Sequence, residues 1–74
     1  MKRIVIAGNY RQFCHWCSVN EVYRRDPNVV YASSSERLLG ISGAVEVVRI
    51  GTWYERSDLR EIEASIACIQ AKGQ

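Results

Sequence analysis

Cys14 and Cys17 form a C-x-x-C motif, the pattern with the most direct chemical potential in this 74-residue sequence. Such a pair can act as a thiol redox centre or supply half of a tetrahedral zinc site. The redox hypothesis needs a thiol at a helix N-terminus, where the helix dipole lowers its pKa. The helix predicted here begins near Asn9, so Cys14 lies more than one turn inside it, where this field has faded.

A zinc site at the same motif would need further ligands, for which His15 and Cys68 are the candidates. His15 lies about 160° around a helix from Cys17, so the two side chains cannot bind one ion on an intact helix. We therefore expect Cys17 to pack in the core with Cys14 beside it, and His15 to be a surface residue. A redox or metal function of Cys14 and Cys17 is kept as an alternative, and we predict neither a cofactor nor enzymatic activity.

Two polar turns raise a second hypothesis, the binding of a nucleotide or another small ligand. Gly8 and Asn9 follow the first apolar run, and Ser33 and Ser34 follow the second. Backbone amides at helix N-termini bind anions, but the glycine fingerprints of dinucleotide-binding and P-loop proteins are absent. Helix capping accounts for both turns. A Rossmann-like ligand site at Asn9, Ser33 and Ser34 is therefore kept as an alternative.

The turn after the third apolar run carries Trp53, Tyr54 and Arg56, which belong to the residue types that dominate binding hot spots. Ligands of open α/β sheets bind outside the carboxyl ends of the strands. At that end the turn would meet Tyr10 and Arg11 of the first turn. We predict a protein-binding surface from these five residues. A competing interpretation is that Trp53 folds back onto the core, and both interpretations hold if Tyr54 points outward.

Three apolar runs predict the strands that would position these turns, at residues 3–8, 29–32 and 45–50. The first contains an unbroken apolar stretch, which is typical of a strand buried on both faces. A helix is expected after each strand, because each predicted helix start has a capping box: Asn9 with Gln12, Ser33 with Glu36, and Asp58 with Glu61. The short middle helix would bury Leu38 and Leu39 and end at Gly40.

The order β-α-β-α-β-α predicts one small α/β domain, residues 1–74, with a three-stranded parallel sheet and right-handed crossovers. We favour strand order 2-1-3, because the first strand has the composition of a central strand, and keep 3-2-1 as the alternative. Both edges of such a sheet lie near its centre, which favours self-association. A homo-oligomer is therefore expected, unless Glu46 and Arg49 shield the edges of a monomer.

The charge and hydropathy of the chain exclude several function classes. Ten basic and eight acidic residues are dispersed, with a formal net charge of +2, so the basic stripe of a nucleic-acid-binding protein is not indicated. The apolar run at residues 4–7 is shorter than the roughly 7–15 residues of a signal peptide or the roughly 20 of a membrane span. Three cysteines without such a signal fit reduced thiols. We expect a soluble cytoplasmic protein without a membrane partner.

Residues 3–16, 29–33 and 45–63 together resemble small uncharacterised proteins encoded by actinobacterial phages. The most specific pieces are G-N-Y-R-Q-F at residues 8–13 and G-T-W-Y-E-R at residues 51–56. The resemblance implies a viral source and expression in the cytoplasm of a bacterial host, and it brings no established activity. The first strand and turn are also loosely similar to Rossmann-like domains, but such a likeness does not transfer function. The expectation is a phage accessory protein that binds a host protein or itself.

Overall fold

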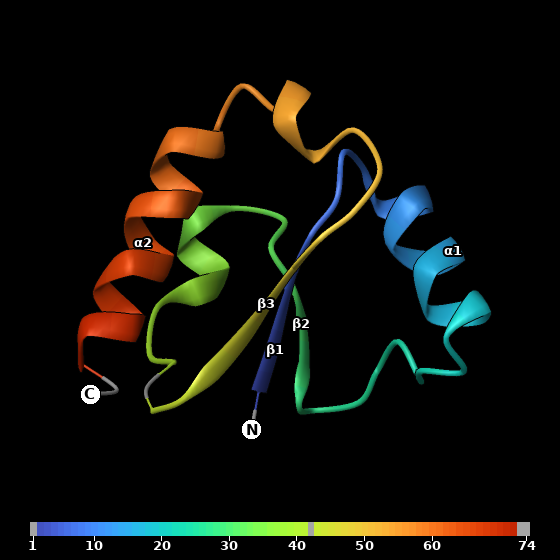
Figure 1. Ribbon diagram of the computed structural model, residues 1–74, viewed down its shortest axis with the longest axis horizontal. Coiled ribbons are helices and arrows are strands. Elements are labelled where there is room, and N and C mark those ends of the chain that lie inside the picture. The colour runs from blue at the N-terminus through green and yellow to red at the C-terminus, as the bar shows by residue number, and fades with distance from the viewer. Residues whose placement is uncertain (1, 42, 73–74) are drawn as a thin grey trace.

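The computed structural model describes residues 2–41 and 43–72, which form a three-stranded parallel sheet between two helices (Figure 1). The strands are β1 (Lys2–Ile6), β2 (Val29–Tyr31) and β3 (Val45–Arg49), and the helices are α1 (Tyr10–Val19) and α2 (Leu59–Lys72). Two short 3-10 helices, η1 (Ser35–Leu38) and η2 (Trp53–Glu55), lie in the connections. No helix in the described part of the chain is long and apolar enough to cross a membrane.

The strand order is β2-β1-β3, which confirms the favoured prediction. β1 pairs with β2 from Arg3 opposite Val29, and with β3 from Lys2 opposite Val45. The central position of β1 follows from its composition, because Ile4, Val5 and Ile6 are fully buried. An unbroken apolar run suits a strand that has a core on each side.

Alternate side chains of β1 enter two separate cores, because successive residues of a strand point to opposite faces of the sheet. On the α1 face the buried residues are Val5, Ala7, Phe13 and Cys17. On the α2 face, which η1 also covers, they are Ile4, Ile6, Ala32, Leu38, Ile62, Ile66 and Ile69. The two faces of the sheet therefore carry separate cores. Side chains that extend from opposite faces contribute to different surfaces of the protein.

The first predicted capping box forms only in part. Asn9 has extended backbone angles and its side chain accepts the backbone N–H of Gln12 at 2.9 Å, as predicted. The Gln12 side chain does not complete the box. It accepts the backbone N–H of Gly8 instead and reaches Thr52 in the turn after β3. Gln12 can reach Thr52 as a tertiary partner because β3 lies directly beside β1.

The predicted middle helix is wrong in its type and its cap. The connection contains only the 3-10 turn η1, whose N-cap is Ser34 rather than Ser33, without a hydrogen bond from its side chain. Leu38 is buried, but Leu39 is 77% exposed. Too few residues separate Ser34 from Gly40 for an α-helix, and 3-10 geometry suits such short connections. Gly40 has a φ of 85°, so the predicted left-handed stop is confirmed.

The predicted side-chain cap of the last helix is also replaced, here by a contact with a near neighbour in the chain. α2 begins at Leu59, after Asp58 as expected, but both carboxylate oxygens of Asp58 accept hydrogen bonds from Arg56. The helix buries the face predicted from its periodicity, through Ile62, Ile66 and Ile69. The hydrophobic pattern thus located the helix correctly, whereas the polar side chain at its start serves a different partner.

Candidate functional site: the carboxyl end of the sheet

The Gln12 side chain ties the turn after β1 to the turn after β3. Its Oε1 accepts the backbone N–H groups of Gly8 at 2.8 Å and Thr52 at 3.0 Å. Its Nε2 donates to Thr52 Oγ1 at 3.0 Å. The contact requires glycine at residues 8 and 51, because a Cβ at Gly8 would overlap the Thr52 hydroxyl and one at Gly51 would overlap Gln12. We call this arrangement the Gln12 bridge.

Arg56 ties the turn after β1 to the turn after β2. Its Nη1 donates to the carbonyl oxygens of Ala7, at 3.3 Å, and Ala32, and its Nη2 donates to the carbonyl of Ser33 at 2.9 Å. Asp58 accepts from Nε at 3.0 Å and from Nη2 at 2.9 Å. The Arg56 side chain is only 9% exposed. We call this arrangement the Arg56 bridge.

The two bridges occupy the place where an open α/β sheet usually binds its ligand. The connections from β1 and β2 cross opposite faces of the sheet, so the carboxyl ends of β1 and β3 form its switch point. Gln12 already bonds the amides of Gly8 and Thr52 there. The Asn9 side chain caps α1, and the Ser33 carbonyl accepts from Arg56. Of the residues predicted for a small ligand, the Asn9 side chain and the Ser33 carbonyl are thus engaged within the protein, whereas the Ser34 side chain makes no capping bond.

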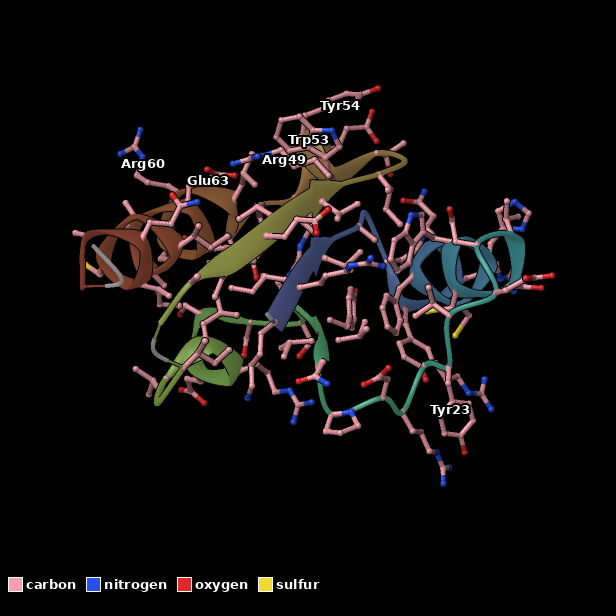
Figure 2. All side chains as sticks on the ribbon, turned by 60° about the horizontal axis from the view of Figure 1, so that its bottom comes forward. Tyr23, Arg49, Trp53, Tyr54, Arg60 and Glu63 are labelled. Atoms are coloured by element: carbon pink, nitrogen blue, oxygen red, sulfur yellow. The ribbon has the colours of Figure 1, made fainter. Side chains whose placement is uncertain are left out.

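A cluster of aromatic and charged side chains lies above the α2 face at the same end (Figure 2). We call it the aromatic surface and define it as Arg49, Trp53, Tyr54 and Glu63. The Arg49 guanidinium lies 5.6 Å from the centre of the Trp53 ring and forms paired bonds to Glu63 at 2.8 and 3.1 Å. The ring of Tyr54 meets that of Trp53 edge to face at 5.9 Å.

Comparison of the chain with protein-family models, curated proteins and solved structures found no match. Function is therefore inferred from the geometry of the chain itself.

The turn after β3 directs its two aromatic side chains differently. Trp53 packs against the core on the α2 face. Tyr54 is 61% exposed. The structure thus combines both interpretations of this turn, with Trp53 directed inward and Tyr54 outward.

The other predicted binding residues do not join Trp53 and Tyr54. Tyr10 lies on the α1 face, where its ring packs 5.9 Å from Phe13 and 5.7 Å from Tyr31. Arg11 is exposed on α1 beside Gly51. Arg56 lies in its bridge, and its side chain is too buried to contact a partner directly. The sheet therefore separates Tyr10 and Arg11 from Trp53 and Tyr54, and burial in its bridge sets Arg56 apart from them.

Sequence reasoning missed two residues of the aromatic surface, Arg49 and Glu63. They are separated by 14 positions and come from β3 and α2, so no local spacing connects them. A signal was present in the alternation of β3, since Arg49 shares the face of Val45 and Val47. That face is the one that α2 covers. The sequence pattern did not indicate which acidic residue of the last helix, Glu61 or Glu63, would pair with Arg49.

Cys14 and Cys17 lie together on α1, and Cys68 lies apart from them on α2. Cys17 is 3% exposed, and burial raises the pKa of its thiol, with a smaller contribution from Cys14. Cys14 is half-buried, and its Sγ lies 3.9 Å from Nη1 of Arg24. Cys68 is exposed on α2, across the sheet. Within residues 2–41 and 43–72, no three His, Cys, Asp or Glu side chains gather in an arrangement that could hold a metal.

The environment of Cys17 predicts that its thiol reacts slowly with alkylating reagents. Because Cys17 is buried and its thiol is held protonated, we expect iodoacetamide to modify Cys68 rapidly and Cys17 only through opening of the domain. Mass spectrometry of timed samples near pH 8 measures both rates. The Cys68→Ser variant should lose the fast modification, and denaturant should make all thiols fast. Modification of Cys17 at the rate of Cys68 in the folded protein would contradict this environment.

Proposed function

We propose that the protein is a small protein-binding domain and that its partner docks on the aromatic surface. The observation that carries this proposal is the position of Tyr54, which is 61% exposed while its ring rests against a fixed Trp53. Tyr, Trp and Arg are the residue types enriched in binding hot spots. Here one residue of each type lies within a single cluster.

The contacts beneath Tyr54 favour binding because they reduce the entropy that binding would cost. Trp53 is fixed by the core on one side and by the Arg49 guanidinium on the other. Arg49 is itself held by two hydrogen bonds to Glu63. Side chains that are already ordered lose little conformational freedom in a complex, so more of the contact energy becomes affinity.

The resemblance of residues 8–13 and 51–56 to actinobacterial phage proteins supports a more specific proposal. In it, the chain is a phage accessory protein that binds a host protein in the bacterial cytoplasm. Self-association is the alternative form of the same activity, and the unpaired outer edges of β2 and β3 support it. A small-ligand site at Asn9, Ser33 and Ser34 gains no support, because the Asn9 side chain caps α1 and the Ser33 carbonyl accepts from Arg56.

Replacing Tyr54 with alanine is expected to reduce partner capture by tenfold or more, a typical effect for a central hot-spot residue. The matched control is Tyr23→Ala, because Tyr23 is 70% exposed and lies away from the aromatic surface (Figure 2). The measurement is a quantitative crosslinking pull-down from the host cell, with the solution mass of the purified chain alongside. If Tyr54→Ala and Tyr23→Ala retain the same partner and the same mass as the unchanged protein, the aromatic surface is not the binding site.

A further inference from the structure

An apolar groove lies on the α1 face of the sheet, opposite the face that carries the aromatic surface. We call it the α1–β3 groove. Its volume is about 510 Å³. Its apolar wall is formed by Trp16, Val19 and Ile50, of which Val19 is 66% exposed. The remaining lining residues are Arg11, Gln12, His15, Asn20 and Gly51.

The groove exists because one face of β3 has no helix of its own. α1 connects β1 to β2 and packs on one face of the sheet. η1 and α2, which precede and follow β3, both pack on the opposite face. Val48 and Ile50 on the α1 face therefore stay only half-buried beside Trp16. An uncovered apolar strand next to a helix is the kind of surface on which a further helix packs.

The polar groups of the groove decide what could occupy it. Gln12 is used in its bridge, and the Asn20 side chain donates to the Trp16 carbonyl at 2.9 Å. Arg11 and His15 are exposed, and none of the groove's lining residues is acidic. A small polar ligand would find few groups to orient it. A second copy of the chain, related by a two-fold axis, would place its own Arg11 near the first Arg11, and the two like charges would repel each other.

We propose that the α1–β3 groove binds an amphipathic helix of a partner protein, one with aliphatic residues on its buried side and carboxylates beside Arg11. The aliphatic side chains would cover Trp16, Val19 and Ile50. The carboxylates would pair with Arg11 and accept a hydrogen bond from the His15 ring. This helix-in-groove mode depends on anchors at helical spacing. The groove is a second surface, separate from Tyr54.

The test uses two synthetic helical peptides that share leucines at helical spacing and differ only in flanking glutamates or lysines. The sequence contains two tryptophans, so the Trp53→Phe variant reports on Trp16 alone. We expect the glutamate peptide to shift Trp16 fluorescence to the blue in a saturable manner. Its affinity should be at least tenfold higher than that of the lysine peptide and should fall as salt is added. If Trp53→Phe folds poorly, the anisotropy of a labelled peptide with the unchanged protein replaces this measurement.

Two substitutions on exposed positions and one control make the result specific. Val19→Asp should abolish binding of the glutamate peptide, and Arg11→Glu should reverse the preference toward the lysine peptide. Tyr54→Ala should bind both peptides like the unchanged protein, which separates this groove from the aromatic surface. Equal affinity for the two peptides, the absence of a saturable change with the glutamate peptide, or full binding by Val19→Asp would each overturn the proposal.

Discussion

Replacing Arg56 with alanine is expected to destabilise the protein by about 3 kcal/mol, because buried carbonyl groups lose a charged donor. Ala7 and Ala32, whose carbonyls accept from Arg56, are fully buried residues. Domains of this size are stable by only about 5–10 kcal/mol, so the loss is a large fraction of the total. We expect the melting temperature to fall by about 12–24 °C. Thermal unfolding followed by circular dichroism measures the change.

Two further variants separate the geometry of the Arg56 bridge from its charge. Arg56→Lys keeps a positive charge, but a single ammonium group cannot reproduce the planar fork that spans several carbonyls and Asp58. It should recover only part of the lost stability. Arg37→Ala removes an exposed arginine of η1 and should change the melting temperature little. If Arg56→Ala melts together with Arg37→Ala, the bridge contributes nothing to stability.

Replacing Gln12 with alanine is expected to cost about 2 kcal/mol, because the half-buried amides of Gly8 and Thr52 lose their acceptor. The loss should concentrate at the carboxyl end of the sheet. Hydrogen exchange of these two amides should therefore accelerate more than exchange in the centre of β1. Gln70→Ala, at an exposed position of α2, is the matched control. Unchanged protection of both amides in Gln12→Ala would contradict the role of the bridge.

Gln12→Glu tests the same bridge through its pH dependence. Its carboxylate can accept both N–H groups, and the Thr52 hydroxyl can rotate to donate to it. Hydrogen bonds to the charged form and the nearby helix N-terminus would lower the pKa of this carboxyl in the folded state. The variant should therefore match the unchanged protein at neutral pH and lose stability as the pH falls through the carboxyl pKa. Equal stability of the two proteins across the acidic range would count against this contact.

The two bridges explain why, in this sheet of order β2-β1-β3, we propose binding at the surface rather than in the crevice at the switch point. The polar side chains nearest the switch point are used to hold three turns together. In a chain of 74 residues the hydrophobic cores are small, so we expect such cross-links to contribute a large share of the stability. Exposed groups remain available in two other places, the aromatic surface and the α1–β3 groove.

The strands and helices could be predicted from the sequence because hydrophobic patterning acts locally. The unbroken apolar run of β1 predicted a central strand, and the spacing of Ile62, Ile66 and Ile69 predicted the buried face of α2. The strand order followed from the same pattern. The predicted middle helix was wrong because the segment between its cap at Ser34 and its stop at Gly40 holds only a 3-10 turn.

The sequence by itself thus determined the α/β fold, the central strand and the turn that carries Trp53 and Tyr54. Only the tertiary structure decided the partners of the polar side chains. Gln12 has a local capping role available, yet its side chain also reaches Thr52 in the turn after β3. Arg56, held by its near neighbour Asp58, donates to the carbonyls of Ala7 and Ser33 in two distant turns. Apolar side chains need only be buried, which a periodic pattern encodes. A polar side chain needs one particular partner, and that partner is fixed only when distant turns meet.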